Sequence, residues 1–257
     1  MTDMEGISGI CRQGQVRTGT EEWKLSVPLA EGDFNAAIAG AALAGARRIV
    51  LNDAHGGGNN IRIENMDERA EYERPLGGGN MMPALLGGGF DLAFHIGAHA
   101  MAGTQDAFLD HTQSSLSWHN YRVNGQRWGE IAQFAAYLGH FGVPLVLVTG
   151  DEAACREARE LLGSEIETVA VKTALGRRAA RCLATKVARQ RIQEAAGRAL
   201  RLKDRIKPFQ PKLPAEVVVE FHSSDVADSV ACSPGVERVD ARTVRKTAAT
   251  ARELVGW

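Results

Sequence analysis

The sequence predicts an α/β fold: a doubly wound, mostly parallel sheet with helices on both faces, plus a smaller C-terminal α+β unit. Short apolar segments of strand length alternate with segments of helical spacing along much of the chain. Several strand segments are apolar almost throughout, as expected for strands buried on both faces of a parallel sheet. A run with three prolines, residues 207–214, then interrupts the alternation. With 257 residues, 44% of them hydrophobic, the chain can also bury a large core.

The first part of the chain supplies its expected elements in helix-then-strand order. Residues 33–46 are rich in alanine at helical spacing, and the β-branched run after them predicts a buried strand. The Asn124-Gly125 pair, between two short extended segments, is typical of a hairpin. The elements expected up to residue 150 are a helix over 33–46, a strand over 47–53, a short helix over 81–86, a strand over 90–96, the hairpin over 121–128, a helix over 129–141 and a strand over 144–150.

The remaining chain predicts a second, smaller unit. We place a soft boundary near residue 165, which gives an α/β domain over 1–165 and an α+β domain over 166–257, with strands allowed to be shared across it. The basic run at 177–181 is expected to lie on a solvated helix face. The elements expected after residue 150 are a helix over 152–162, a strand over 167–171, a long basic helix over 185–203, a strand over 216–221, a turn at 234–235, a strand over 236–239 and a helix over 243–255.

Charge and hydropathy exclude several classes of protein. The formal net charge of −1 gives no attraction to polyanions, which argues against nucleic acid as a partner. No apolar run reaches the roughly 18 to 20 residues of a membrane helix, and the opening residues have neither the basic region nor the apolar core of a signal peptide. The four cysteines are scattered without paired spacing and are expected to be free thiols. We therefore expect a cytoplasmic protein without a membrane segment.

Five side chains of metal-ligand type lie at the starts and ends of predicted elements. Asp3 and Glu5 are two residues apart, so an extended segment directs both toward one side. His55 and His99 each follow a predicted strand and Glu130 begins a predicted helix, positions at which an α/β fold gathers its site. Taken singly, each of these is more often a solvated turn residue or a structural histidine. Together they predict a cage for two metal ions, with zinc favoured and manganese or cobalt as alternatives.

His111 is the candidate for proton transfer. It lies in the loop that begins at His99, and an imidazole beside a metal pair can move a proton near neutral pH or stabilise an oxyanion. The alternative is a histidine on a surface loop. His95 shares the strand parity of His99 and could support the ligands from behind. Asp53 could support the ligand His55 or cap the glycine-rich turn, and Lys172 and Thr173 could face the same cleft.

These segments together resemble one family, the zinc-dependent D-aminopeptidases, also described as dipeptide transport proteins of the DppA type. The opening Asp-Met-Glu-Gly motif is the most diagnostic segment of the resemblance. The matching segments follow the family's order and are residues 3–9, 51–55, 96–100, the segment around His111, and residues 124–130, 148–151 and 169–172.

The resemblance implies a metal centre, a substrate and an assembly. The implied ligands of two zinc ions are Asp3, Glu5, His55, His99 and Glu130. Asp3 would bridge the two ions, and His111 matches the family's catalytic histidine. Family members are described as peptidases that release amino-terminal D-residues and as ring-shaped homo-oligomers that enclose their active sites. The implied substrate is thus a short peptide, and the implied assembly is a homo-oligomeric ring, for example a decamer.

The expected mechanism is hydrolysis by a metal-held water, which needs no side-chain nucleophile. His111 would then act as acid and base or stabilise the oxyanion, and a role as nucleophile is the third alternative. Two other functions stay open. One is a metal-dependent amidase or esterase that acts on another substrate, because the cage fixes hydrolysis but not the pocket that selects the acyl group. The other is a metal-depleted, non-catalytic binding protein that keeps the ring.

The chain departs from the family pattern at two places. Only Met1 and Thr2 precede Asp3, and such a short terminus is expected to fray and loosen the first two ligands. We therefore expect fewer than two bound ions per chain unless upstream residues are restored. One extra residue also separates His99 from His111, and this bears on whether His111 reaches the site.

Overall fold

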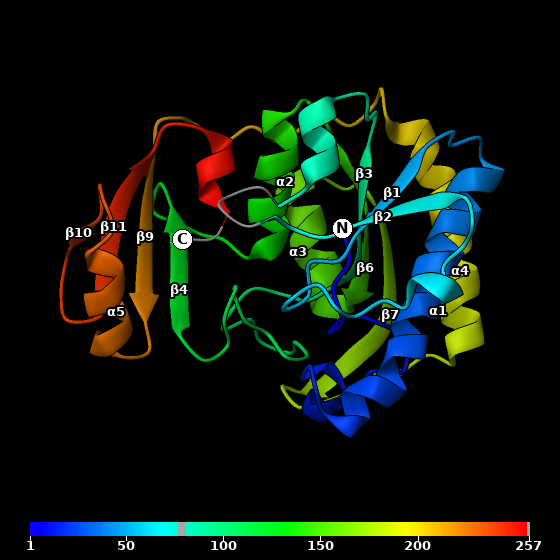
Figure 1. Ribbon diagram of the computed structural model, residues 1–257, viewed down its shortest axis with the longest axis horizontal. Coiled ribbons are helices and arrows are strands. Elements are labelled where there is room, and N and C mark those ends of the chain that lie inside the picture. The colour runs from blue at the N-terminus through cyan, green and yellow to red at the C-terminus, as the bar shows by residue number, and fades with distance from the viewer. Residues whose placement is uncertain (77–80, 256–257) are drawn as a thin grey trace.

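The computed structural model describes residues 1–76 and 81–255. Figure 1 shows a sheet enclosed by helices on one side of the molecule and a second sheet on the other. The mixed α/β class is confirmed, with parallel strands and helices on both sides of the first sheet. The doubly wound arrangement stays a prediction.

The first sheet is parallel at its centre. Its strand order is β3-β6-β7-β8, with β3 (Ala93–Ala98), β6 (Leu145–Asp151), β7 (Glu167–Gly176) and β8 (Ala179–Cys182). The β3–β6 and β6–β7 pairs are parallel, whereas β7 and β8 form an antiparallel hairpin. All seven residues of β6 are buried, as its unbroken apolar run predicts.

A parallel pair of strands lies beside β3. It consists of β1 (Ile49–Asn52) and β2 (Ala70–Glu73). Thr2 joins this pair to the first sheet, because it forms parallel bridges to Asp53 on one side and Ile96 on the other. The amino-terminal segment therefore lies between β1 and β3.

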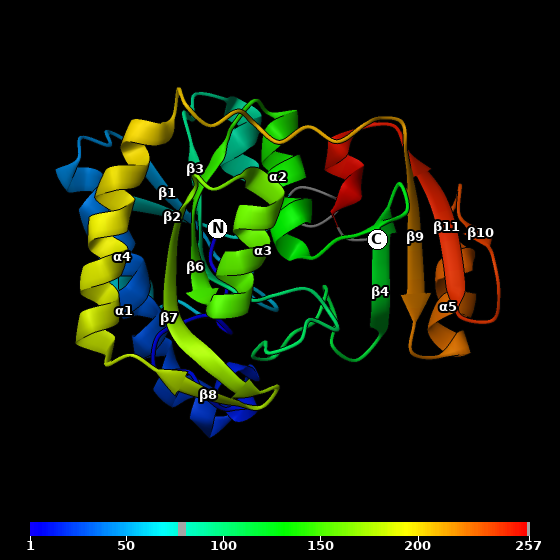
Figure 2. The ribbon, with the colours of Figure 1, turned by 180° about the vertical axis from the view of Figure 1, so that it is seen from behind.

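Four helices cover the first sheet, and Figure 2 shows them from behind. Helices α1 (Glu21–Leu43) and α4 (Thr185–Ala199) pack against each other on one side. Helices α2 (Glu130–His140) and α3 (Glu152–Leu162) lie on the other side. Helix α1 begins well before the predicted start, because the Thr20 hydroxyl accepts a hydrogen bond from the Trp23 N–H and caps its first turn.

The second sheet is antiparallel, with the order β10-β11-β9-β4-β5. Helix α5 (Ser224–Ala231) packs beside it, and the sequence patterns did not predict this helix. Buried and more exposed residues alternate along β9, as in a sheet with one face on a core. Its strands are β4 (Trp118–Val123), β5 (Gln126–Arg127), β9 (Ala215–Phe221), β10 (Glu237–Arg238) and β11 (Thr243–Ala248).

Three expected elements differ in the structure. The helix predicted over 243–255 is wrong: β11 occupies its first half, where Thr243, Val244 and Thr247 pair with β9. The basic run at 177–181 belongs to the β7–β8 hairpin instead of a helix face. The short helix near residue 81 is a 3-10 turn, Pro83–Gly87. Strand pairing overrides the helical spacing of the side chains in β11 and in the β7–β8 hairpin, and a 3-10 turn replaces the helix near residue 81.

Strands are shared across the boundary expected near residue 165. Strands β6 and β7 lie on opposite sides of it and pair with each other. Strand β4 precedes it and pairs with β9. Strands are thus shared across the boundary, as the prediction allowed, and the division into two domains stays a prediction.

The backbone of the first three residues forms hydrogen bonds with β1 on one side and β3 on the other. The N–H of Thr2 donates to the Asn52 carbonyl at 2.9 Å, and the N–H of Asp3 donates to the Ile96 carbonyl at 2.9 Å. The Ile96 N–H donates in turn to the Met1 carbonyl at 3.0 Å. This segment is part of the sheet and not the frayed end that the short terminus led us to expect.

Two further observations concern the chain as a whole. None of the helices within residues 1–76 and 81–255 is long and apolar enough to cross a membrane. The cysteines are free, as predicted, with Cys155 buried in α3 and Cys232 exposed.

Candidate metal centre

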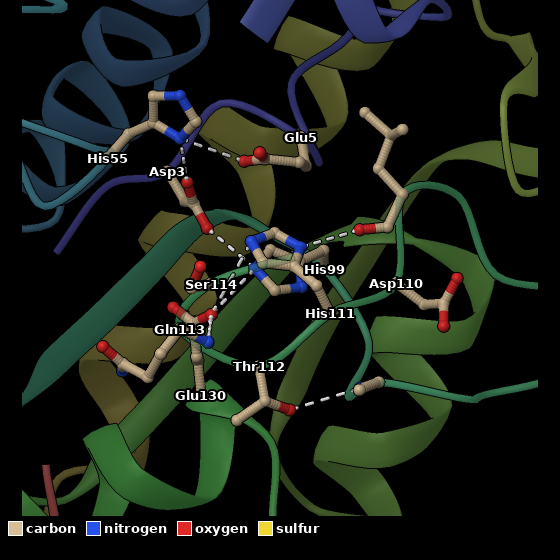
Figure 3. Close-up of polar contacts among 12 residues, drawn as sticks. Asp3, Glu5, His55, His99, Asp110, His111, Thr112, Gln113, Ser114 and Glu130 are labelled. Atoms are coloured by element: carbon tan, nitrogen blue, oxygen red, sulfur yellow. Dashed lines mark hydrogen bonds and ion pairs between the residues drawn. The ribbon is translucent and has the colours of Figure 1, made fainter. Parts of the chain in front are cut away.

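The six candidate side chains converge beyond the ends of β1 and β3 (Figure 3). They form two groups, and within each group the candidate ligand atoms lie within 4.8 Å of one another. We call these groups the first half, Asp3, Glu5 and His55, and the second half, His99, His111 and Glu130.

The Asp3 carboxylate connects the two halves. Its Oδ1 lies 2.8 Å from His55 Nδ1, and its Oδ2 lies 3.4 Å from His99 Nε2. Within the halves, Glu5 Oε2 is 3.1 Å from His55 Nδ1, and Glu130 Oε1 is 3.3 Å from His99 Nε2. One oxygen toward each half is the arrangement that a carboxylate bridging two ions requires.

Each of the three histidines uses one ring nitrogen for a backbone carbonyl. A carbonyl oxygen only accepts, so the nitrogen that faces it carries the hydrogen and the other nitrogen is left for the carboxylate side. A bare lone pair directed at carboxylates is unfavourable, so either a proton or a metal ion must lie between this nitrogen and the carboxylates. The three contacts are His55 Nε2 to Val16 O at 2.8 Å, His99 Nδ1 to Ala100 O at 3.0 Å and His111 Nδ1 to Leu109 O at 2.8 Å.

Two buried atoms at the centre have close ion-pair contacts but no hydrogen bond. Glu5 Oε2 lies 3.1 Å from His55 Nδ1 and His99 Nε2 lies 3.3 Å from Glu130 Oε1, and neither atom has a hydrogen-bond partner within the described part of the chain. A buried polar atom without a partner costs about 1–3 kcal/mol. Carboxylate oxygen and imidazole nitrogen are zinc ligands, so the two atoms fit a site that binds a divalent cation.

The pKa directions reflect the crowding of opposite charges. Burial opposes ionisation of Asp3, but its hydrogen bond with His55 and the charge of His99 together hold its pKa well below the usual range. Burial also opposes protonation of the histidines, yet the charge of Glu5 for His55, and of Glu130 for His99, raises both pKa values well above normal. The carboxylates of Asp3, Glu5 and Glu130 together favour a positive charge at the centre.

Two glycines allow the opening motif to lie directly against β3. A Cβ on Gly6 would lie 2.1 Å from the Ala98 carbonyl oxygen, and one on Gly97 would lie 2.2 Å from the Asp3 carbonyl oxygen. Gly97 also has a φ of +86°, in the region that favours glycine. The Gly6 N–H donates to the Gly97 carbonyl at 2.8 Å. These contacts bring Asp3 to the end of β3.

His111 reaches the centre despite the extra residue before it. Its ring stacks on that of His99 with centroids 3.9 Å apart, and its Nε2 lies 3.9 Å from Glu130 Oε1. Leu109 and Gln113 on either side have φ values of +51° and +60°, which are costly for residues with a Cβ. The Gln113 N–H donates to Glu130 Oε1 at 2.6 Å, so the strained loop is bonded to the second half.

The other predicted residues take supporting positions. The Asp53 carboxylate accepts bonds from the Asn60 N–H and Nδ2, and Asn60 Nδ2 also donates to the His55 carbonyl at 2.6 Å. Asp53 thus orders the loop that carries His55. His95 is buried against Phe134, and burial lowers its pKa to about 4, so it is a neutral core residue.

Glu157 is a residue that sequence reasoning missed. Its Oε2 accepts the Met101 N–H at 2.8 Å, and burial raises its pKa to about 7. A Cβ on Gly129 would lie 2.5 Å from its Oε1. Glu157 therefore lies between the loop that follows His99 and the start of α2. The available signal was an acidic side chain on the alanine-rich buried face of α3.

Three comparisons relate the chain to known proteins. Residues 1–257 match the family model of peptidase M55, described as D-aminopeptidase. The chain is 30% identical over 239 residues to a D-aminopeptidase of Bacillus subtilis strain 168, with 91% of this chain and 85% of that relative covered. Its fold is similar to that of the Zn-dependent D-aminopeptidase DppA from Bacillus subtilis, described as a self-compartmentalizing protease. The TM-score is 0.90 at 28% identity, with 98% of this chain and 92% of the other covered.

Proposed function

The chain belongs to the D-aminopeptidase family of peptidases, M55, and on this premise we propose that it releases amino-terminal D-residues from short peptides with two zinc ions. The family predicted from the motifs is confirmed, and so is its class as a metallo-aminopeptidase. The observation that carries the proposal of two ions is the Asp3 carboxylate, which directs one oxygen toward each half of the centre.

The ligands divide between the two halves. Glu5 and His55 would hold one ion and His99 and Glu130 the other, with Asp3 shared between them. Zinc is supported by the Zn-dependent relative and by the mixture of oxygen and nitrogen ligands. We place His111 beside the second ion and not among its ligands, as the residue that moves protons.

Bound zinc would activate water for attack and polarise the scissile carbonyl. His111 Nδ1–H donates to the Leu109 carbonyl, which leaves Nε2 free to take a proton from the attacking water and return it to the leaving amine. The stacked ring of His99 and the neighbouring Glu130 keep Nε2 on the side of the ligands. The burial of Asp3 and Glu5 limits water on the first half, which strengthens their hold on a cation.

The D-residue and the assembly are argued from relatives. The curated relative is a D-aminopeptidase, and the similar structure is described as self-compartmentalizing, which supports a homo-oligomeric ring that encloses its active sites. A decamer is one such ring. The cytoplasmic location predicted from the opening residues stays a prediction.

The test is metal analysis combined with matched peptide substrates. Because the first three residues are hydrogen-bonded to β1 and β3, the loss of an ion expected from the short terminus no longer follows. Protein purified without chelator should therefore contain two zinc ions per chain and cleave D-Ala-containing dipeptides faster than the L counterparts. Chelation should abolish turnover, and added zinc should restore it. Equal or faster cleavage of L-peptides, or turnover of other amides or esters alone, would favour the amidase or esterase alternative. A metal-poor, inactive ring would favour the binding-protein alternative.

A further inference from the structure

Lys172 is a buried ammonium group behind the first half of the centre. It lies on β7 where parallel pairing with β6 ends, and only 2% of the residue is exposed. Its Nζ donates to the Glu5 carbonyl and to the Ile10 carbonyl, both at 2.6 Å. A single side chain therefore holds both ends of the turn that begins at a proposed metal ligand.

The same ammonium group also contacts the loop of the proposed catalytic histidine. Lys172 Nζ lies 4.9 Å from the centre of the Phe108 ring, within the range of a cation–π contact. The Phe108 N–H donates to Asp151 Oδ2 at 2.8 Å, which fixes this part of the loop to the end of β6. Lys172 thus touches the backbone of one half of the centre and the loop that supplies His111 to the other.

We propose that Lys172 is a positioning residue that fixes the Glu5 backbone and so determines the affinity for the ion in the first half. The inference rests on the proposed two-ion centre. Glu5 Oε2 lies 3.1 Å from His55 Nδ1, a partner that is itself a proposed ligand, and it has no hydrogen bond among the described residues. The position of this oxygen therefore depends on how firmly the Glu5 backbone is held. The carbonyl bond from Lys172 and the adjacent Gly6 N–H bond to Gly97 are the contacts that hold this backbone.

A matched control separates this role from general support of the turn. Ser8 lies in the same turn, and its hydroxyl and N–H donate to the Asp33 carboxylate at 2.6 and 2.8 Å. These bonds stabilise the turn without a contact to Glu5. Ser8→Ala should therefore loosen the turn but leave the affinities for both ions close to their wild-type values, whereas loss of Lys172 should weaken one ion selectively.

The experiment is a competitive zinc titration of metal-free full-length protein with a chromogenic chelator. Lys172→Met keeps the length of the side chain and removes its donors. We expect the affinity for one ion to fall about 10- to 100-fold, the range for groups that orient metal ligands, and the other to stay within about twofold. In a Glu130→Gln background, where the second half is weakened, Lys172→Met should then weaken the remaining ion as well.

Three outcomes would overturn the inference. The first is that Lys172→Met binds both zinc ions with wild-type affinity. The second is that Lys172→Met loses affinity equally at both sites. The third is that Ser8→Ala shows the same selective loss of affinity at one site. If Lys172→Met does not fold, Lys172→Gln takes its place under the same criteria, because its neutral side chain is one bond shorter and should not reach both carbonyls. A wild-type chain that binds a single ion would contradict the proposed function. An unchanged affinity for that ion in Lys172→Met would then reject the inference separately.

Discussion

The two halves of the metal centre differ in how deeply they are buried. The side chains of Asp3 and Glu5 in the first half are 7% and 5% exposed. Those of Glu130 and His111 in the second half are each 16% exposed. The two histidine ligands do not follow this difference, because His55 is 11% and His99 is 2% exposed. The more exposed side of the centre is therefore that of Glu130 and His111, and we expect a peptide to approach there.

The halves also differ in how the fold holds them. Asp3 and Glu5 belong to a terminal segment whose bonds go to β1, β3 and β7, all distant in the sequence. Glu130 is the first residue of α2, and His99 directly follows β3, so local secondary structure positions them. Tertiary contacts thus position the first half, which we call the deep half. The ends of regular elements position the second half, which we call the accessible half. From this comparison we predict that the first half mainly holds a metal ion and that the second half carries out the proton transfer.

The largest expected effect comes from the residue that joins the halves. Asp3→Asn removes a charge that faces both ions, so both affinities should fall by more than the roughly 10- to 100-fold typical of groups behind ligands. Turnover should disappear with them. Glu130→Gln is the control, and it should weaken one ion only. Zinc titration measures both, and loss of a single ion in Asp3→Asn would mean that Asp3 does not bridge.

The next effect tests whether the accessible half is reactive. His111→Ala should lower kcat about 10²- to 10⁴-fold, the usual contribution of a general acid or base, while zinc content stays at the wild-type value. Its Nε2 is free for proton transfer because Nδ1 is held by Leu109. Elemental analysis and steady-state kinetics on the same preparation make the measurement. Loss of an ion in this variant would instead identify His111 as the third ligand of the second half.

The pH dependence of the free energy of unfolding tests whether Glu157 supports the accessible half. Burial raises the pKa of Glu157 from 4.5 to about 7, so the folded chain keeps a proton that the unfolded chain releases at lower pH. Between about pH 4.5 and 7 the folded state binds more protons, and its stability falls as the pH rises. At about 1.4 kcal/mol per unit, Glu157 should remove about 2 to 3 kcal/mol between pH 5 and 8.

Glu157→Gln should abolish that part of the pH dependence. Urea unfolding of metal-free wild type and variant at pH 5 and pH 8 gives the difference. Glu152→Gln, an exposed residue at the start of the same helix, is the control and should keep the wild-type dependence. An identical pH dependence in wild type and Glu157→Gln would show that the buried carboxyl does not titrate in this range.

The sequence predicted the features that depend on local pattern. The apolar run of β6 and the amphipathic spacing of α3 lie at the expected residues, and five metal-ligand candidates and His111 meet at one place. Features that depend on distant pairing were missed. Strand β11 has charged and β-branched residues that also fit a helix, and only its bonds to β9 decide the outcome. The sequence suggested that Lys172 faces the cleft but not that it bonds to the Glu5 carbonyl, and no local signal indicates that Glu157 bonds to Met101.

The smallest expected effect concerns the outer edge of the accessible half. Arg177, at the tip of the β7–β8 hairpin, donates to the Asp110 carbonyl at 3.0 Å and pairs with its carboxylate at 3.1 Å, directly beside His111. The arginine side chain is 42% exposed, and an exposed ion pair contributes about 0.2–1 kcal/mol. Arg177→Ala should therefore lower kcat by no more than about fivefold. High salt, which screens the wild-type pair, should narrow the difference.

The control for this variant is Arg205→Ala, since Arg205 pairs with Glu165 away from the His111 loop, at a more exposed site where the side chains are 60% and 57% exposed. It should leave kcat unchanged. Within residues 1–76 and 81–255, Asp3, Glu5 and His55 have no ion pair with an arginine or lysine, so zinc affinity should be the same in both arginine variants. A loss of zinc in Arg177→Ala would show that the hairpin supports the ligands themselves, and the division between a binding half and a reactive half would then be wrong.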